Sequence, residues 1–202
     1  MIIIYCEQNS PEWFSLRAGI PGASSFDQIF TAKTLKPSAS RIKLLYQLAG
    51  ERIIKSKPET YSSYYMKRGI ELEPQARDVF SMLKEIDVNQ VGYCYYDERK
   101  DRGCSPDGLI GEVSGLELKC PSLSVHVGYL MKKDLPSDYF QQVQGSLYIT
   151  GYEYWYFMSY HPGIKPLIIK VYRDEKFISL LHAELESFCL ELNELTEKLR
   201  AI

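Results

Sequence analysis

Hydrophobic side chains in the last part of the chain recur at helical spacing. Between residues 174 and 200 the apolar positions lie three or four residues apart: Phe177, Leu181, Leu185, Phe188, Leu192, Leu195 and Leu199. An α-helix brings such positions onto one face, so the pattern predicts one long amphipathic helix over 174–200. That face either packs on the rest of the fold, which is the simpler interpretation, or forms a seam between copies of the protein.

Helices are also expected in the first half of the chain. Short ones are predicted over 10–17, where Ser10 and Pro11 open the helix, and over 24–30, where Ser24 can act as the N-cap. A basic helix is predicted over about 39–55 and a further one over 69–86. Pro74 would lie near the start of the last helix, where its missing N–H costs least.

The second half of the chain changes to short apolar segments that are typical of strands. The predicted strands are 91–96, 108–111, 116–120, 154–160 and 166–172, with a helix over 137–150 between the third and the fourth. The first three strands would form a meander. This order of elements predicts an α/β fold with a central mixed β-sheet flanked by helices.

Composition narrows the class of protein. The 202 residues, 45% hydrophobic and 25% charged, suit a single domain with a sizeable core. No stretch approaches the about 20 apolar residues that cross a bilayer, so no membrane partner is expected. Five scattered cysteines without a C-x-x-C pair indicate reduced thiols in a cytosolic protein. Without a glycine-rich phosphate loop, chemistry driven by ATP or a dinucleotide is not expected.

Charges are unevenly distributed, although the net charge is only −2. Residues 33–57 carry seven basic residues and one acidic residue, whereas residues 171–198 carry seven acidic and three basic ones. This separation would allow the protein to present one positive surface. Two solvated helix faces explain the same pattern, so charge alone leaves both interpretations open.

The stretch from Ser105 to Pro121, with SPDG and GLELKCP at its ends, carries the candidate chemistry. Glu117 and Lys119 are two residues apart in a predicted strand, so their side chains leave the same face. Asp107 starts the preceding strand, and carboxylates on strands about 4.8 Å apart can share Mg²⁺ or Mn²⁺. Such a cation would polarise a phosphodiester and activate water, and Lys119 would position that water or offset negative charge.

An ion pair that only joins two strands is the alternative for these three residues. The bare pattern D-x9-E-x-K occurs by chance in many soluble proteins. From the three residues alone, both interpretations remain open.

Six blocks of sequence carry a family resemblance. The blocks are SPEWFSLRAGIPGAS (10–24), RGIELEPQAR (68–77), CSPDG (104–108), GLELKCP (115–121), YFQQVQGSLYITG (139–151) and, more weakly, VYRDEKF (171–177). In this order they resemble the PD-(D/E)xK nucleases, in particular the lambda-exonuclease-like (YqaJ-type viral recombinase) family of phage recombination nucleases. The blocks span nearly the whole chain, and the resemblance implies a restriction-endonuclease-like core.

The resemblance implies a metal site and a catalytic lysine. Glu73, on a predicted helix, would complete the metal shell begun by Asp107 and Glu117. The backbone carbonyl of Leu118 would be a further ligand, and Lys119 would be the catalytic ammonium group. The cofactor would be Mg²⁺, for which Mn²⁺ can substitute.

The resemblance also implies a catalytic glutamine that orients the nucleophile or a metal-bound water. Gln142 is the first choice and Gln144 the alternative. Two residues apart on a helix, they face nearly opposite ways, so only one of them can reach the site.

Arg17, Ser24 and Ser105 match family positions that bind the 5′-phosphate of DNA. A guanidinium beside hydroxyls and a helix N-terminus is a favourable anion site. The chain lacks a further phosphate-binding arginine after the ELKCP block; either His126 replaces it, or the preference for a 5′-phosphate is weaker. Met66 stands where an apolar wedge would part a duplex end, although a lone methionine is more often part of a core.

As a whole, the resemblance implies a Mg²⁺-dependent, ATP-independent 5′→3′ exonuclease that degrades one strand of linear double-stranded DNA and leaves 3′ single-stranded tails. It implies a ring-shaped homotrimer and a single-strand annealing protein as partner, encoded by a phage or prophage and acting in the bacterial cytoplasm. Within one exonuclease domain over 1–202, residues 1–60 would bind the DNA end and its 5′-phosphate. Residues 64–172 would form the catalytic core, followed by the C-terminal helix over 174–200.

Two other functions are compatible with these residues. An endonuclease of the same superfamily, of the restriction or repair type, would share the metal site without needing a DNA end, so it would cut a closed circular duplex. A catalytically inactive DNA-end-binding module is the second. Against it stands the presence of Glu73 together with all three strand residues.

Overall fold

The computed structural model describes residues 1–56 and 64–202, apart from the side chains of Tyr65 and Met66. Lys57 of the basic segment and the Met66 side chain, the predicted wedge, therefore lie outside the described part. The helices are α1 (Pro11–Arg17), the 3₁₀ helix η1 (Ala23–Gln28), α2 (Arg41–Ile54), α3 (Tyr64–Lys84), α4 (Leu123–Lys132), α5 (Ser137–Thr150) and α6 (Glu175–Arg200). The strands are β1 (Ile2–Ile4), β2 (Phe30–Thr31), β3 (Lys36–Pro37), β4 (Tyr93–Tyr95), β5 (Gly103–Cys104), β6 (Gly108–Ile110), β7 (Ser114–Lys119), β8 (Tyr154–Ser159) and β9 (Leu167–Tyr172).

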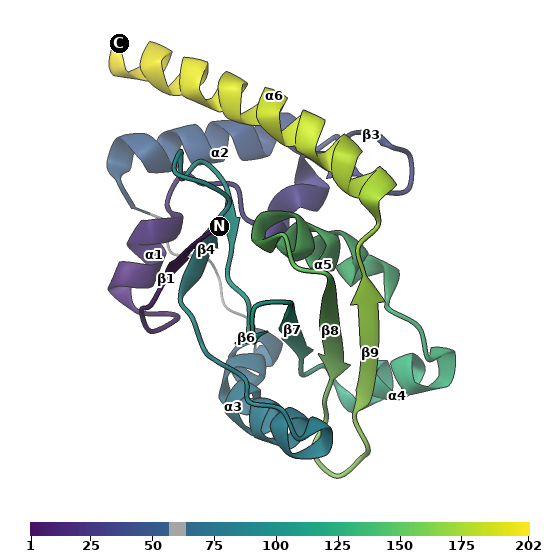
Figure 1. Cartoon of the computed structure of the whole chain (residues 1–202). Coiled ribbons are helices and arrows are strands. Elements are labelled where there is room, and N and C mark those ends of the chain that lie inside the picture. Colours follow the sequence, from purple (N-terminus) through teal and green to yellow (C-terminus); the bar gives the residue numbers. More distant parts are fainter. Residues whose placement is uncertain (57–63) are drawn as a thin grey trace.

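A four-stranded sheet in the order β6-β7-β8-β9 forms the framework for the site (Figure 1). β7 and β8 run parallel, whereas β6 pairs with β7, and β9 with β8, in antiparallel fashion. A parallel pair needs a long crossover, which here contains α4 and α5. The predicted central mixed sheet flanked by helices is confirmed.

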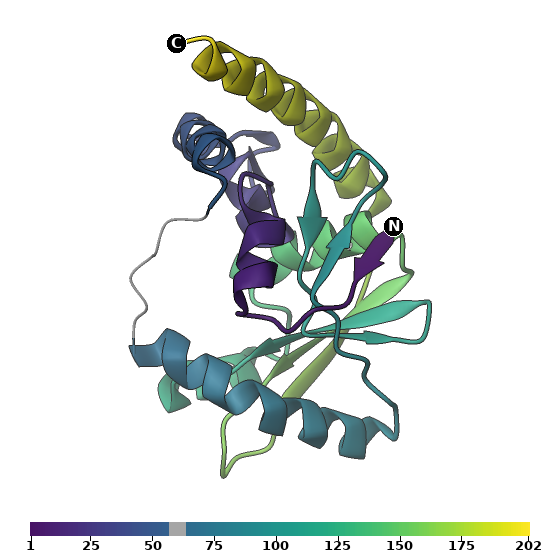
Figure 2. The same cartoon turned by 90° about the vertical axis from the view of Figure 1, so that its left-hand side faces the viewer.

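The two faces of this sheet pack against different helices. On one face Leu118 belongs to an apolar cluster with Phe80 of α3. On the other face Phe157 belongs to the larger core with Val143 of α5. Figure 2 shows α3 and α5 on opposite sides of the strands. Glu117 is paired in register with Phe157, so its side chain projects on the α5 side.

A second sheet, in the order β1-β4-β5, contains the first strand of the predicted meander. β4 pairs with β1 on one side and β5 on the other, rather than with β6. The prediction of one meander over 91–120 is therefore wrong. β1 and β4 lie far apart in the sequence, so no local pattern predicts that they pair.

Other local predictions have mixed outcomes. The helices predicted over 10–17, 137–150 and 174–200 are confirmed within a residue. Ser24 lies in the first turn of η1, which Gly22 precedes as the cap, so its predicted capping role is wrong. Pro74 lies inside α3, because that helix already begins at Tyr64. No pattern predicts α4, because much of its apolar surface is exposed and forms no buried stripe.

The basic α2 and the acidic α6 pack against each other. Arg41 of α2 donates two hydrogen bonds to the Glu191 carboxylate of α6, at 2.5 and 2.9 Å. Arg52 donates to Asn193 Oδ1 at 2.6 Å. The apolar stripe of α6 is buried from Phe177 to Leu192, as the simpler interpretation expects, whereas Leu199 at its end is exposed. Part of the separated charge therefore joins these helices. Within the described residues, no helix has both the length and the apolar character needed to cross a membrane.

A buried arginine ties the turn before β5 to α6. The Arg102 side chain has no exposed surface and lies 2.9 Å from Asp101 and 2.5 Å from Glu186. Arg99 donates two further hydrogen bonds to Glu186, at 2.8 and 2.9 Å. The hydrogen bonds from Arg99, and then those from Arg102, lower the pKa of Glu186 to about 2. Burial acts in the opposite direction but is outweighed.

Glu186→Gln is expected to lower the free energy of unfolding at pH 7 by about 2 kcal/mol, because a buried guanidinium loses a charged partner. The folded-state pKa of Glu186 lies below its unfolded value, so its contribution is complete above about pH 4.5 and is lost as the pH falls through about 2. Denaturant unfolding at several pH values should show a smaller loss over this range in the variant. Glu194→Gln, at an exposed position of α6, is the control. Equal behaviour of both variants would show that the contact adds no net stability.

Candidate active site

The candidate active site is built on the β6–β7 hairpin. Gly108 pairs with Leu116, and the Asp107 N–H donates to the Leu116 carbonyl at 3.1 Å, so Asp107 lies opposite Glu117. The Asp107 carboxylate accepts a hydrogen bond from the Leu118 N–H at 2.5 Å. β6 begins only at Gly108, so no β6 backbone carbonyl accepts from the Leu118 N–H. The Asp107 carboxylate accepts that hydrogen bond instead and is thereby fixed beside β7.

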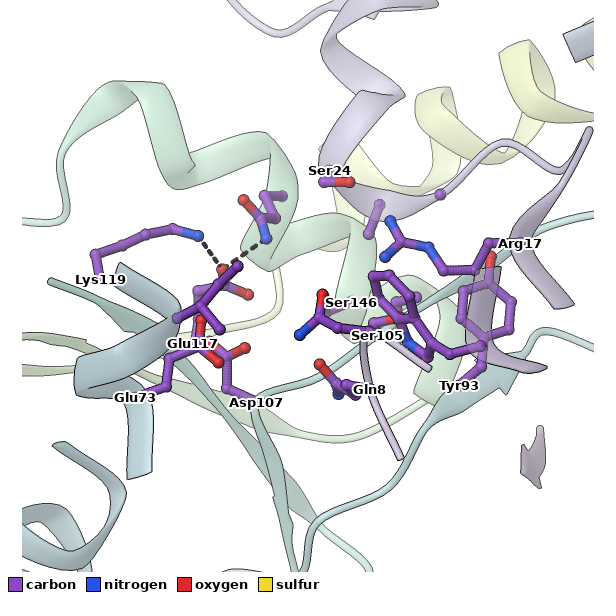
Figure 3. Close-up of a pocket in the computed structure, with 17 residues that line it drawn as sticks. Gln8, Arg17, Ser24, Glu73, Tyr93, Ser105, Asp107, Glu117, Lys119 and Ser146 are labelled. Atoms are coloured by element: carbon purple, nitrogen blue, oxygen red, sulfur yellow. Dashed lines mark hydrogen bonds and ion pairs between the residues drawn. The ribbon is translucent and has the colours of Figure 1, made fainter. Parts of the chain in front are cut away.

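Glu117 and Lys119 leave the same face of β7 and meet there. Lys119 Nζ lies 2.5 Å from Glu117 Oε1, and Gln142 of α5 donates to the same oxygen at 2.6 Å (Figure 3). Glu117 is 2% exposed. Two donors from different elements thus fix the orientation of a buried carboxylate.

Glu73 of α3 lines the same cavity as Asp107 and Glu117 (Figure 3). Burial raises the pKa of Glu73. Arg77 and Lys119 lower it, and Glu117 raises it. The helix carboxylate therefore interacts electrostatically with the strand residues.

Crowding of negative charge is pronounced at Asp107. Burial, together with the Glu117 and Glu73 carboxylates, raises the pKa of Asp107 well above its usual value. Burial alone would lower the pKa of Lys119, but Glu117 and Asp107 raise it, so the amine stays protonated. The cavity contains more carboxylates than its lysine can neutralise, and a bound cation would relieve that excess.

The chemistry of these donors fits a small, hard cation. Within the described residues, no group of three or more His, Cys, Asp or Glu side chains is arranged to hold a metal ion by itself. Mg²⁺ commonly keeps several waters and takes only one or two carboxylates from the protein. Asp107 and Glu117, on adjacent segments of one hairpin, meet that requirement.

The backbone of β7 presents a further oxygen to the site. The Lys119 carbonyl accepts a hydrogen bond from the Tyr160 N–H at 2.8 Å, on the β8 side. Successive carbonyls of a strand point to opposite sides. The Leu118 carbonyl therefore points toward the side of the Asp107 carboxylate, where it is available to a metal ion.

The predicted phosphate-binding residues Arg17, Ser24 and Ser105 line the same cavity, which has a volume of about 180 Å³. The Arg17 guanidinium lies over the Trp13 ring, 3.8 Å from its centroid. Trp13 Nε1 donates to Ser105 Oγ at 3.1 Å. Figure 3 shows Arg17 at one end of the cavity and Lys119 at the other. The carboxylates therefore lie with Lys119 at one end of this space, and Arg17 lies at the other.

Several further residues line the cavity without a role in the sequence-based predictions, among them Gln8, Trp13, Tyr93 and Ser146. Gln8 Nε2 donates to the carbonyls of Val91 and Pro106, at 2.9 and 2.8 Å, and so holds the segment that leads into Asp107. Trp13 stands in the family block over 10–24, so the resemblance provided a signal for it. Gln8 and Tyr93 lie outside the quoted blocks, so no such signal was available.

His126 does not replace the missing arginine. Its side chain is fully buried, and its ring nitrogens lie 2.7 Å from Ser159 Oγ and 3.0 Å from the Lys165 carbonyl. The hypothesis that His126 binds phosphate is wrong, because both nitrogens already join α4 to the end of β8 and the turn that follows.

The two candidate glutamines of α5 have different surroundings. Gln142 contacts Glu117 in the cavity. Gln144 is buried, donates to the Tyr172 carbonyl and accepts from the Asp174 N–H, each at 2.9 Å. Gln144 therefore connects α5 to the start of α6, and its partners lie outside the cavity.

Solved structures with this arrangement of elements include two of the alkaline exonuclease from Laribacter hongkongensis, one in complex with dAMP. Each has a TM-score of 0.85 at 28% sequence identity and covers 95% of this chain and 97% of the exonuclease. A phage-related exonuclease from Haemophilus somnus 129PT matches in fold, with a TM-score of 0.71 at 13% identity over 89% of this chain and 96% of that one. The predicted restriction-endonuclease-like fold is confirmed.

The fold and the family together define the class as nucleases of the lambda-exonuclease type. The family model of the YqaJ-like viral recombinase domain matches residues 12–153, and the chain belongs to this family. The predicted family is thereby confirmed. Comparison with curated proteins returns no match.

Proposed function

We propose that this protein is a Mg²⁺-dependent, ATP-independent exonuclease that degrades one strand of linear double-stranded DNA in the 5′→3′ direction and leaves 3′ single-stranded tails. The observation that carries the proposal is the single cavity lined both by acidic residues with a lysine and by an arginine with serines. One end suits a cation beside a phosphodiester, and the other suits a terminal phosphate. Such a cavity would hold a 5′ end and cut next to it.

The acidic end would carry out the hydrolysis. The proposed ligands of Mg²⁺, for which Mn²⁺ would substitute, are the side chains of Asp107 and Glu117 and the carbonyl of Leu118. Glu73 would complete the shell by moving toward the ion when it binds. The bound ion would polarise the phosphodiester and lower the pKa of a water molecule. Lys119 would orient the attacking water or stabilise the negative charge that develops on the phosphate. Gln142 would keep Glu117 oriented through their hydrogen bond.

The basic end would recognise the terminal 5′-phosphate through Arg17, Ser24 and Ser105. A guanidinium held over a tryptophan ring has restricted orientations for its N–H groups, which suits the binding of a phosphate. The Laribacter relative has been crystallised with dAMP, a nucleotide that carries such a group. That complex supports the same ligand class here.

The chain would act as one exonuclease domain. Residues 1–60 would bind the DNA end, residues 64–172 would form the catalytic core, and residues 174–200 the C-terminal helix. We propose a ring-shaped homotrimer around DNA and a single-strand annealing protein as partner, encoded by a phage or prophage and acting in the bacterial cytoplasm. Membership of the viral recombinase family supports this setting.

Incubation with linear duplex labelled separately at each 5′ and 3′ end tests the activity, polarity and end requirement together. We expect loss of the 5′ label first, accumulation of 3′ single strands, activity with Mg²⁺ or Mn²⁺ and none in EDTA. ATP should make no difference. A covalently closed circle should remain intact. Cutting of the circle would favour the endonuclease alternative, and end binding without any digestion would favour an inactive end-binding module.

Arg17→Ala is expected to slow digestion of 5′-phosphorylated ends about tenfold more than that of 5′-hydroxyl ends, because only the former lose a charge-assisted contact. The measurement compares initial rates on two duplexes that differ only in the terminal phosphate. Arg173→Ala, which removes an arginine that bonds Glu175 and the Leu147 carbonyl, is the control. Equal slowing on both ends by Arg17→Ala would contradict the phosphate assignment.

A further inference from the structure

The basic end of the cavity contains a tyrosine hydroxyl that the proposed function has not used. Tyr93 of β4 lines the cavity near Arg17 (Figure 3). It is 1% exposed, and among the described residues its hydroxyl has no hydrogen-bond partner. A buried hydroxyl without a partner costs free energy, so such a group in a cavity indicates an acceptor that enters from outside.

Close packing defines where this hydroxyl lies. The Tyr93 ring contacts that of Tyr95 edge to face, with 4.9 Å between their centroids. β5 can approach the ring because residue 103 is glycine; a Cβ there would come within 2.5 Å of it. On the cavity side, a Cβ added at Gly22 would still lie 3.9 Å from the hydroxyl oxygen. The ring is therefore held firmly, and because residue 22 has no side chain, an atom can lie next to the hydroxyl in van der Waals contact.

We propose that the Tyr93 hydroxyl donates a hydrogen bond to the terminal 5′-phosphate of the DNA strand, beside the Arg17 guanidinium, and so helps the enzyme to select phosphorylated ends. This assignment rests on the proposed function and adds a residue to the phosphate-binding set. An ionised phosphate offers oxygen acceptors to both donors. A 5′-hydroxyl end would leave them unpaired, and a site built to bond a group discriminates against ligands that lack it.

The electrostatic surroundings keep Tyr93 a donor. Burial raises the pKa of Tyr93, against the lowering effect of Arg17, so the phenol remains protonated. The guanidinium would then supply positive charge, and the neutral phenol a directed hydrogen bond without further charge.

Tyr93→Phe removes the hydroxyl and keeps the ring. Initial rates would be measured with Mg²⁺ on linear duplexes bearing a 5′-phosphate or a 5′-hydroxyl at the same end. The ratio of the two rates is expected to fall about tenfold, mainly through slower digestion of the phosphorylated duplex. The melting temperature should be unchanged or higher, because the variant loses an unpaired buried group. A purely structural hydroxyl would give the opposite, a lower melting temperature with an unchanged ratio.

Tyr148→Phe is the matched control, because this buried phenol bonds His182 outside the cavity and should leave the ratio unchanged. A wild-type ratio in Tyr93→Phe would overturn the assignment while leaving the exonuclease function intact. Failure of the wild-type protein to digest either duplex would instead refute the proposed function. If Tyr93→Phe does not fold, Tyr93→Leu also lacks the hydroxyl and is judged by the same ratio.

Discussion

Lys119→Ala is expected to slow DNA digestion at least about 100-fold while leaving binding to DNA ends intact. The ammonium group lies 2.5 Å from the buried Glu117 carboxylate and is placed to act on charge that develops during hydrolysis. Its loss should affect the transition state far more than the bound substrate. Digestion of labelled duplex measures the rate, and fluorescence anisotropy of an end-labelled duplex without divalent cations measures the binding.

A lysine elsewhere in the same sheet provides the control. Lys170 of β9 lies 3.5 Å from the centroid of the Tyr154 ring and does not line the cavity. Lys170→Ala should digest DNA at the wild-type rate. Digestion at the native rate by Lys119→Ala would show that its assigned role is wrong.

Asp107→Asn is expected to slow digestion about 1,000-fold or more, the factor that corresponds to about 4 kcal/mol of lost transition-state stabilisation. At the same time it should raise the melting temperature of the metal-free protein. Burial and the nearby carboxylates of Glu117 and Glu73 raise the pKa of Asp107, so its ionised form destabilises the fold. An asparagine oxygen can still accept the hydrogen bond from the Leu118 N–H.

The pH dependence of this stabilisation has a defined sign. A carboxyl group whose pKa is raised in the folded state costs no stability below its unfolded pKa of about 3.9. The cost grows as the pH rises above that value and is complete once the pH exceeds the folded-state pKa. The difference in melting temperature between Asp107→Asn and the wild-type protein should therefore be larger at pH 8 than at pH 4.

Thermal melting with added Mg²⁺ tests the metal site independently of activity. Mg²⁺ should raise the melting temperature of the wild-type protein, because a ligand that binds the folded state stabilises it. The rise should be reduced or absent in Asp107→Asn. Asp78→Asn, at an exposed position of α3, should respond like the wild-type protein. A full Mg²⁺ response in Asp107→Asn would remove Asp107 from the proposed ligands.

Local patterns were sufficient where an element's buried face follows its own period. The stripe from Phe177 to Leu199 predicted α6, and its face is buried as far as Leu192. The two-residue spacing of Glu117 and Lys119 placed both side chains on one face of β7, where they meet. α4 was not predicted, because its apolar side chains are largely exposed and follow no buried stripe.

Contacts between segments that lie far apart in the sequence could not be predicted from local patterns. The pairing of β1 with β4 joins the N-terminus to the middle of the chain. His126 has the chemistry of an anion ligand, and only its burial against Ser159 and the Lys165 carbonyl shows that it is used internally. Side-chain chemistry is readable from sequence, whereas solvent exposure depends on what packs around it.

The sequence by itself determined which chemical groups this protein has, most of its helices and strands, and its family. Only the tertiary structure decided that carboxylates from α3 and from the β6–β7 hairpin line one cavity together with an arginine from α1. The tertiary structure also decided that the Tyr93 hydroxyl is buried beside this cavity without a hydrogen-bond partner among the described residues. The physical reason is that the spacing of hydrophobic positions indicates only which face of each segment is buried. The shared space between segments arises only when their packing brings distant polar groups together.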